Sequence, residues 1–337
     1  MRLFNVIRAP EWWGFKLPPL LAVAYATALL AGGSLYQMAP LFLFFLGSLA
    51  IGAVYVSVVN DLTDIQEDLA VGKKNRMANL SAWPRALILT GCLGIGVVFG
   101  CFMWPDLLTV ILYVMAWIAF SLYSVPPFRF KERGLLGVIC DASGAHLFPS
   151  LLMVSGISYA MGVEIDYYWF GLVGIWALTF GCRGILWHQF LDRENDIKTN
   201  VTTFATRTNP EKFKSIAVVL FSVELVALIG MLIHLNRLVA WVLLVLYVVL
   251  VVIRYKRYAN IPIILITPVN RHSQVLMIDY YQAFFPLGLL FSASVDQSLA
   301  WIILLIHTAL FPVNIIIPLR DYWMAIDALY RQIRYSS

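Results

Sequence analysis

The chain has 337 residues, of which 61% are hydrophobic and 13% charged, and its mean hydropathy is +0.80. A composition this apolar excludes a soluble protein, and the apolar runs are too many for a signal peptide or a single membrane anchor. Because no strand-like alternation is sustained, we expect an all-α integral membrane protein and no outer-membrane barrel.

The apolar runs predict ten membrane-spanning helices within a single transmembrane domain, residues 1–337. These helices are expected at residues 15–33, 41–60, 85–103, 106–123, 135–155, 168–191, 213–234, 238–254, 278–293 and 299–319. The segment at 278–293 has Asp279 at its start and Pro286 within it. Without this segment, the last helix would run in the opposite direction.

The basic residues follow this topology. All 24 Lys and Arg residues except Arg183 and Arg237 fall on the side of the predicted membrane that holds Met1. By the positive-inside rule both termini then face the cytoplasm, and we expect a bacterial cytoplasmic membrane. Because topology explains the net charge of +5, we infer no nucleic-acid partner.

A cluster of acidic residues closes the second predicted helix, between Asn60 and Asp68. On a continuous helix, Asp61, Asp64 and Asp68 occupy positions i, i+3 and i+7, so their carboxylates share one face. Like charges this close repel unless a cation holds them, and a few hard oxygen ligands with room for water and phosphate suit Mg²⁺. The pattern predicts a Mg²⁺-diphosphate site at the membrane surface, against the alternative of a solvated acidic loop.

Two cationic loops lie on the same predicted side as this cluster. Arg76 belongs to a short basic segment that follows the acids directly. After the fourth helix, a double proline prevents a simple helical continuation, so Arg129 and Lys131 are expected in a loop. These cations can neutralise a diphosphate held on the metal, and an ordinary positive-inside loop is the alternative.

A second carboxylate pair closes the sixth predicted helix. Asp192 and Asp196 stand at i and i+4 on one helical face, with His188 one turn earlier on the same stripe. Because both clusters end even-numbered helices, the topology puts them on the same side of the membrane. There they can bracket a diphosphate through Mg²⁺ ions and neutralise it as it departs, with Lys198 contributing further positive charge.

Three ionisable residues fall inside predicted helices, where such groups are costly and usually face a cavity. Asp141 and Arg183 lie at similar depth, so one interpretation is a structural ion pair between them. In the other interpretation, Asp141 or His146 is a base that removes a proton from an acceptor or from a final carbocation.

At these motifs the sequence resembles the UbiA superfamily of intramembrane prenyltransferases, over about residues 8–215. The NDxxDxxxD motif that follows the second helix in that family is matched by Asn60, Asp61, Asp64 and Asp68. The DxxxD motif that follows its sixth helix is matched by Asp192 and Asp196.

The chain also departs from the family pattern. The family's compact YxxxK motif reads here as Tyr123 with Lys131 eight residues later, so either Arg129 or Lys131 takes the role of its cation. Arg76 falls where many members have a diphosphate-binding Arg, but the proline that usually follows is absent. Nine helices are usual in the family, whereas the charge distribution favours ten.

The resemblance implies a bundle of nine or ten helices around a central cavity, with Mg²⁺ as cofactor and an isoprenyl diphosphate as substrate. It implies metal binding by Asp61, Asp64, Asp68, Asp192 and Asp196. It implies diphosphate binding by Asn60, Arg76, Arg129, Lys131 and Lys198, with a hydrogen bond from Tyr123.

Three functions remain open. In the first, the protein ionises an isoprenyl diphosphate within the membrane lipid and transfers the prenyl group to a lipophilic acceptor, aromatic or otherwise, releasing diphosphate. In the second, the same metal site serves a membrane terpene cyclase, in which the chain's own double bond captures the carbocation. In the third, the acids couple cations in a transporter; these acids cluster at one membrane face, whereas transporters usually place such charges near the midplane.

Overall fold

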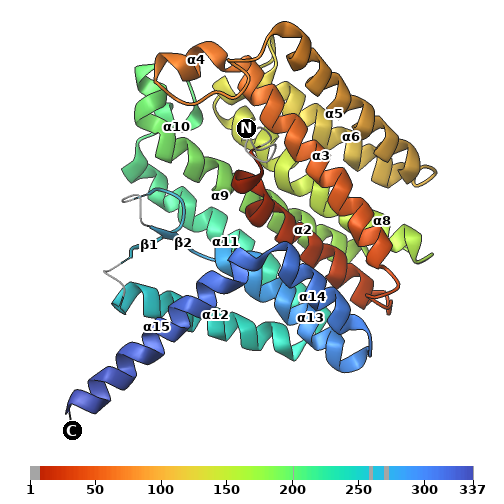
Figure 1. The fold of residues 1–337 in the computed structure, drawn as a ribbon, viewed down its shortest axis with the longest axis vertical. Helices are drawn as coiled ribbons and strands as arrows, with labels where there is room; N and C mark the ends of the chain where they lie inside the picture. The colour runs from red at the N-terminus through yellow and green to blue at the C-terminus, as the bar shows by residue number, and fades with distance from the viewer. Residues whose placement is uncertain (1–7, 200, 258–260, 269–272, 337) are drawn as a thin grey trace.

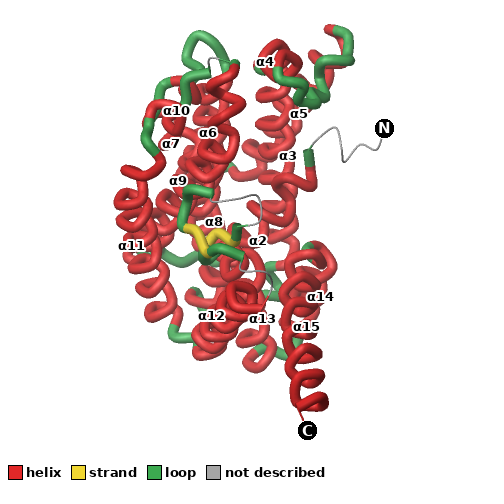
Figure 2. The backbone as a smooth tube through the Cα atoms, turned by 90° about the vertical axis from the view of Figure 1, so that its left-hand side faces the viewer, coloured by secondary structure: helices red, strands yellow, loops and turns green. Residues whose placement is uncertain are grey.

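The structure, a computed structural model, describes residues 8–199, 201–257, 261–268 and 273–336. Two cations that the topology prediction counts on the inner side, Arg2 and Arg271, lie outside these residues. The described chain is mostly helical, and its long helices pack side by side while the last one projects from the bundle (Figures 1 and 2). This arrangement agrees with the predicted all-α fold.

The helices are connected mostly by short turns, and two very short strands, β1 (Ile263–Ile264) and β2 (Gln274–Val275), pair in parallel beside them. The α-helices are α2 (Ala9–Leu30), α3 (Ala39–Thr63), α4 (Ile65–Ala70), α5 (Ala82–Met103), α6 (Leu107–Ser124), α7 (Leu135–Ala142), α8 (Phe148–Ala160), α9 (Tyr167–Lys198), α10 (Phe204–Arg207), α11 (Pro210–Leu235), α12 (Leu238–Arg257), α13 (Phe285–Asp296), α14 (Ala300–Leu310) and α15 (Pro312–Ser336). A 3₁₀ turn, η1 (Phe130–Glu132), and two π-helical turns, η2 (Ser143–Leu147) and η3 (Tyr280–Phe284), complete the list.

Eight helices of the described residues are long and apolar enough to cross a membrane, or nine if α14 and α15 form one broken span. Each of the ten predicted segments coincides with helical structure, but the segment at 278–293 consists of η3 joined to the short α13. The segment at 299–319 is bent by 86° between α14 and α15. Pro312 opens α15 and has no N–H to continue the hydrogen bonding of α14, so the helix breaks there.

Helix α2 runs through the middle of the bundle and is buried along most of its length. It packs against α8 and α13, and more lightly against α3. Its small residues, among them Ala22, Ala24 and Ala26, are fully buried, which lets neighbouring helices approach closely. The first helix of the described residues therefore forms one wall of the space between the others.

The π-helical turn η2 interrupts an otherwise continuous helix from Leu135 to Ala160. Pro149 lies two residues after the turn and cannot donate the backbone hydrogen bond that would hold an α-helix there, so the turn widens. Gly144 lies within it, and a Cβ atom at that position would come within 3.2 Å of the Phe120 ring. The wide turn therefore brings its backbone close to α6, at the site described next.

Candidate active site

A polar cavity of about 330 Å³ lies at the end of the bundle that carries α4 and α10 (Figure 1). All five predicted metal ligands line it, namely Asp61, Asp64, Asp68, Asp192 and Asp196. Cationic and polar residues complete its wall, including Arg8, Asn60, Lys73, Lys74, Arg76, Tyr123, Lys131, His188 and Gln189. The two acidic clusters, far apart in the sequence, therefore share one cavity, which we call the polar cavity.

Asp61 lies on the last turn of α3 and is only 2% exposed. Arg8 donates from Nη1 to its Oδ1 at 3.0 Å, and the backbone N–H of Arg76 donates to its Oδ2 at 3.4 Å. Burial acts to lower the pKa of Arg8, but the carboxylates of Glu11 and Asp61 outweigh it and raise that pKa above its ordinary value. The buried carboxylate is thus neutralised by cations from two other segments.

The helix does not continue through the first acidic cluster. Helix α3 ends at Thr63 and α4 begins at Ile65, with Asp64 between them at φ −109° and ψ 11°. The prediction of one continuous helical face is therefore wrong at Asp64. The hydroxyl of Thr63 donates to the carbonyl of Val59 at 3.0 Å and competes with the helical hydrogen bonding there.

Asp64 is drawn toward the loop after α6. Lys131 forms an ion pair with Asp64, and Arg129 Nη2 lies 3.3 Å from the same carboxylate while also pairing with Glu67. Lys131 lines the polar cavity, whereas Arg129 is not among its lining residues. Of the two cations that the sequence left open, both therefore bind Asp64, and Lys131 faces the cavity.

The loop after α4 is tied to the acids by an asparagine. Asn75 donates from Nδ2 to Asp68 Oδ2 at 2.9 Å and to the backbone carbonyl of Asp61 at 2.7 Å. Its own Oδ1 accepts the backbone N–H groups of Met77 and Ala78, at 3.0 and 3.1 Å. One buried side chain thus fixes the basic loop against the end of α3.

The opposite wall comes from the end of α9. Lys73 Nζ lies 3.1 Å from Asp192 Oδ2, and the hydroxyl of Thr203 donates to Asp196 at 3.4 Å. Gln189, two turns of helix before Asp196, is 5% exposed, and neither atom of its amide has a hydrogen-bond partner among the described residues. A buried amide left unpaired is costly, so a polar group bound in the cavity is its natural partner.

The cavity fits a divalent cation by its chemistry. No three His, Cys, Asp or Glu side chains within the described ranges stand close enough together to hold a metal ion, because cationic side chains separate the carboxylates. The oxygen donors around the cavity are nevertheless carboxylates, side-chain amides and hydroxyls, and oxygen ligands of this kind are the hard ligands that Mg²⁺ prefers. The acids therefore have the right chemistry, with arginines and lysines as their present partners.

Four predicted site residues lie elsewhere or play other roles. Lys198 lines a neighbouring surface hollow with Glu67 and Asn195, not the polar cavity. Asp141 is half-buried on α7 and makes no ion pair with the described residues, whereas His146 is buried in η2 with its ring 4.7 Å from that of Phe180. Asn60 accepts a hydrogen bond from the hydroxyl of Ser124, which joins the ends of α3 and α6.

The predicted ion pair between Asp141 and Arg183 is wrong. Arg183 instead binds Glu224 of α11 with two hydrogen bonds, Nε to Oε2 at 2.6 Å and Nη2 to Oε1 at 2.8 Å. It also donates to the carbonyls of Leu265 and Leu276, at 2.8 and 2.9 Å. Helix α11 packs along α9, so Glu224 reaches Arg183 where Asp141 does not.

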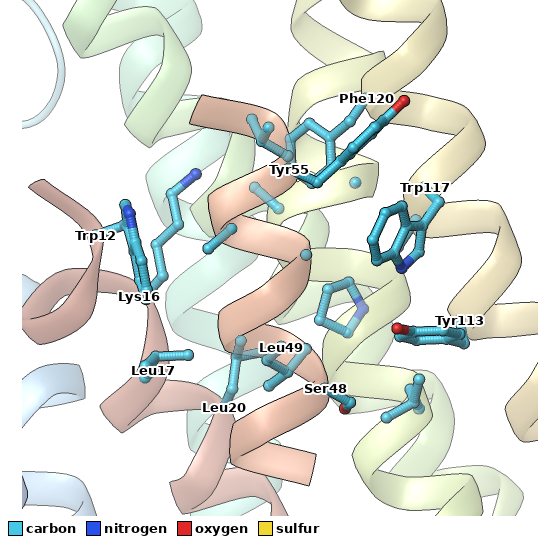
Figure 3. Close-up of a pocket in the computed structure, with 18 of the residues that line it drawn as sticks. Trp12, Lys16, Leu17, Leu20, Ser48, Leu49, Tyr55, Tyr113, Trp117 and Phe120 are labelled. Atoms are coloured by element: carbon cyan, nitrogen blue, oxygen red, sulfur yellow. The ribbon is translucent and has the colours of Figure 1, made fainter. Parts of the chain in front are cut away.

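An apolar chamber of about 100 Å³ lies further inside the bundle, about one helical turn from the polar cavity, and the two share none of the described lining residues (Figure 3). Ser57 lines the chamber one helical turn before Asp61, and Trp12 lines it one turn after Arg8. Aromatic rings form much of the wall, with Trp12, Tyr55, Tyr113, Trp117 and Phe120 around the space. The arrangement places a charged site directly beside a small aromatic pocket.

The sequence analysis missed three residues of this site. Gln189 and Arg8 line the polar cavity, and Lys16 extends from α2 into the chamber, 5.9 Å from the centre of the Phe120 ring. Lys16 was counted only as an inner-side cation. Lys16 lies about two helical turns into α2, which begins at Ala9 and not at residue 15, and Pro10 in the first turn was the signal that could have found this earlier start.

The comparisons with known proteins agree with this geometry. The sequence model of the UbiA prenyltransferase family matches residues 20–263. The chain belongs to the UbiA prenyltransferase family. With the apolar spans, this membership makes it an integral multi-pass membrane protein.

Solved structures of a UbiA homologue from Archaeoglobus fulgidus share its fold. The form bound to DMAPP and Mg²⁺ has a TM-score of 0.55 at 16% identity, and covers 88% of this chain and all of that one. The form bound to GPP and Mg²⁺ has a TM-score of 0.53 at 16% identity, and covers 86% of this chain and 99% of that one. A third structure of this homologue, with no ligand in its description, gives 0.58 at 18% identity, covering 87% and 100% of the two chains.

A curated relative is the lycopene elongase/hydratase of Haloferax volcanii, 28% identical over 217 residues. The match covers 60% of this chain and 65% of the relative, so the chain spans somewhat less than two thirds of that protein's length.

Proposed function

We propose that this protein is a Mg²⁺-dependent intramembrane prenyltransferase, which ionises an isoprenyl diphosphate and transfers the prenyl group to a lipophilic acceptor. One observation carries the proposal: two acidic clusters line one polar cavity, and an apolar, aromatic chamber lies about one helical turn from it. A diphosphate fits the first space by charge and an isoprenyl tail fits the second by polarity. The diphosphates and Mg²⁺ bound by the Archaeoglobus homologue support both assignments.

The residues divide into two groups by charge. Asp61, Asp64, Asp68, Asp192 and Asp196 would hold Mg²⁺, which when bound supplies positive charge to a departing diphosphate. Arg76 and Lys131, which now pair with these acids, are placed to exchange them for diphosphate oxygens. Gln189 and Tyr123 add hydrogen-bonding groups on the same wall.

The chamber protects the reacting carbon. Its aromatic faces attract a developing allylic cation, and its apolar wall keeps water from intercepting it. Lys16 is the exception, because an ammonium repels such a cation; it suits the end of the chamber next to the diphosphate. The proton released after transfer goes to a base, and Asp141 and His146 remain our proposals for it.

The acceptor we propose is a long apolar isoprenoid. The name of the Haloferax relative says that it elongates and hydrates lycopene, a hydrocarbon acceptor of that kind. We further propose that the chain works as one transmembrane domain, with the polar cavity and both termini on the cytoplasmic side. The basic residues around that cavity support this orientation.

The test uses purified protein in detergent with Mg²⁺ and dimethylallyl, geranyl, farnesyl or geranylgeranyl diphosphate, each with and without lycopene. We expect diphosphate release and a prenylated product by mass spectrometry only when the acceptor is present. A chelator should abolish release, and so should Asp61→Asn. Glu211→Gln is the matched control, since this exposed acid of α11 pairs with Lys214 outside the polar cavity.

Two outcomes would overturn the transferase. Cyclic hydrocarbon or terpene alcohol formed without an acceptor, and lost in Asp61→Asn, would make the protein a terpene cyclase. A wild-type protein that consumes none of the diphosphates, with or without lycopene, would show that the protein is not a prenyltransferase for these substrates. If Asp61→Asn released diphosphate as fast as the wild type, the polar cavity would not be the active site.

A further inference from the structure

A second apolar space lies on the lipid-facing side of the bundle, between α5 and α6. This space, the side groove, has a volume of about 750 Å³. Its wall includes Leu93, Val97, Cys101, Val114 and Ile118, all of them exposed on the membrane-facing surface. Neither acidic nor basic residues occur among its lining. A charged diphosphate is therefore excluded from it, whereas a hydrocarbon chain fits.

The side groove and the chamber share one wall. Tyr55, Tyr113 and Trp117 line both spaces. The rings of Tyr55 and Trp117 lie 4.6 Å apart between centroids, and those of Tyr113 and Trp117 lie 5.9 Å apart. Figure 3 shows all three along the same side of the chamber. A partition one side chain thick thus separates the chamber from the groove.

The partition is closely packed, but few polar contacts hold its rings in place. The Trp117 ring rests against Gly96 of α5, where a Cβ atom would come within 2.6 Å of the indole. The hydroxyl of Tyr113 is buried beside the indole nitrogen of Trp117, so this polar contact lies within the partition itself. The hydroxyls of Tyr55 and Ser121 make one hydrogen bond of 2.6 Å across the wall. Few polar contacts would therefore break if the three rings moved aside.

The volumes assign different ligands to the two spaces. At about 100 Å³ the chamber is smaller than the roughly 150 Å³ apolar cavity that accepts a benzene molecule, so it suits a short tail. The donor enters from the polar cavity, where its diphosphate is held. A long apolar acceptor needs another route, and the side groove is larger, uncharged and open to lipid.

We propose that the side groove binds the hydrocarbon chain of the acceptor, and that Tyr55, Tyr113 and Trp117 form a gate through which its reacting end enters the chamber. The inference rests on the proposed prenyl transfer and adds the route and binding site of the second substrate. It makes Gly96 a positioning residue, because its missing side chain leaves room for the Trp117 indole.

A binding test needs no turnover, because Cys101 is an exposed native thiol on the groove wall. We expect lycopene to slow alkylation of Cys101 by N-ethylmaleimide at least fivefold in detergent, as followed by mass spectrometry. The control is Ile111→Cys in a Cys101→Ser background, since Ile111 is 48% exposed on α6 and outside the groove lining. Equal slowing at both thiols, or none at Cys101, would overturn the proposal.

A kinetic test blocks the groove and leaves the chamber intact. Val114 lines the groove only, so Val114→Trp should raise KM for lycopene at least tenfold while KM for the diphosphate stays unchanged. Ile111→Trp adds the same bulk to α6 outside the groove and should leave both values as in the wild type. Unchanged acceptor kinetics in Val114→Trp would refute the gate, whereas a wild type that releases no diphosphate would refute the proposed function instead.

Discussion

Among the groups of charged residues in the described part of this helical bundle, those around Arg183 and around the polar cavity are paired in different ways. Around Arg183 the partners are fixed: Glu224 accepts two hydrogen bonds from Arg183 and a third, at 2.7 Å, from Tyr281. Arg183 and Glu224 are each 1% exposed or less. Around the polar cavity Asp61, Asp64 and Asp192 each meet a cation from another segment, and Asp192 and its partner Lys73 are half exposed. Asp68 and Asp196 instead accept hydrogen bonds from Asn75 and Thr203. The first group is complete without a ligand, whereas the second can exchange partners.

The difference shows how a structural ion pair can be told from a binding site. Gln189 makes the point, because its buried amide has no partner in the described chain although it lines a cavity full of charge. A network that is fully satisfied stabilises a fold, while one with unpaired polar atoms and interchangeable ions is suited to bind something else. The variants below test that separation, from the largest expected effect to the smallest.

Asp64→Asn should cut turnover with a prenyl diphosphate by about 10²–10³-fold, because it removes a charge at the site of the departing diphosphate. Its folding should change little, since Lys131, although only 8% exposed, lines the polar cavity, and Arg129 keeps its ion pair with Glu67. The measurements are kcat/KM and thermal unfolding in detergent. Asp327→Asn, an exposed acid of α15 paired with Arg331, serves as the control. A large loss of thermal stability in Asp64→Asn would contradict the comparison.

Glu224→Gln should do the reverse and lower the free energy of unfolding by about 3–5 kcal/mol, because it leaves Arg183 charged in the bundle without its counterion. Unfolding followed by circular dichroism in detergent measures the change. Replacing both residues, Arg183→Met with Glu224→Leu, should recover most of the stability. If Glu224→Gln were as stable as the wild type, the ion pair between Arg183 and Glu224 would not be needed for the fold.

Gln189→Leu should weaken binding of a prenyl diphosphate by about tenfold, the loss of roughly one hydrogen bond to a charged group. The stability of the empty protein should stay the same or rise, because the substitution removes a buried amide that has no partner within the described chain. Equilibrium binding of a non-hydrolysable diphosphate analogue separates the two effects. A fall in stability with unchanged affinity would place Gln189 with the structural group.

Asp166, at the start of α9, pairs with His234 at the surface and serves as a comparison for the other two groups of charged residues. Slight burial acts to raise its pKa, but the backbone N–H of Trp169 and the ring of His234 outweigh it and hold the pKa below its ordinary value. The stability it contributes is therefore present above the unfolded-state pKa of about 3.9 and is lost as pH falls through the lower folded-state value.

Because the Asp166 side chain is 44% exposed, this contribution should be less than about 1 kcal/mol. Asp166→Asn should flatten that part of the dependence of the unfolding free energy on pH, which thermal melts from about pH 5 to about pH 3 will show. A dependence as steep in the variant as in the wild type would assign the acid sensitivity to other groups.

Most of the fold and half of the site could be predicted from the sequence. Hydropathy located the helical segments because each span must satisfy its backbone hydrogen bonds internally. The spacing of Asp61, Asp64, Asp192 and Asp196 placed both clusters at helix ends on one side, and they do line one cavity. The loop after the fourth helix was also identified, although the sequence left open whether Arg129 or Lys131 takes the role of the family's cation.

The remainder depends on packing, which spacing along one helix does not reveal. Depth alone suggested Asp141 as the partner of Arg183, yet α11 packs along α9 and supplies Glu224. The break at Asp64 depends on local competition for backbone hydrogen bonds, and the bend between α14 and α15 on the missing N–H of Pro312; neither changes the hydropathy profile. The sequence likewise could not show that the buried amide of Gln189 lines the polar cavity, because this depends on which helices pack around it.

The cations that now pair with the acids also bear on how the protein is made. As the chain emerges from the ribosome, Asp61 enters the membrane interface long before Asp192 is synthesised, so the second half of the site does not yet exist. Arg8 and Arg76 are already available, and both lie beside Asp61 in the finished protein. Arginine can therefore shield this carboxylate during insertion, which lets the second helix settle before any metal ion or substrate arrives.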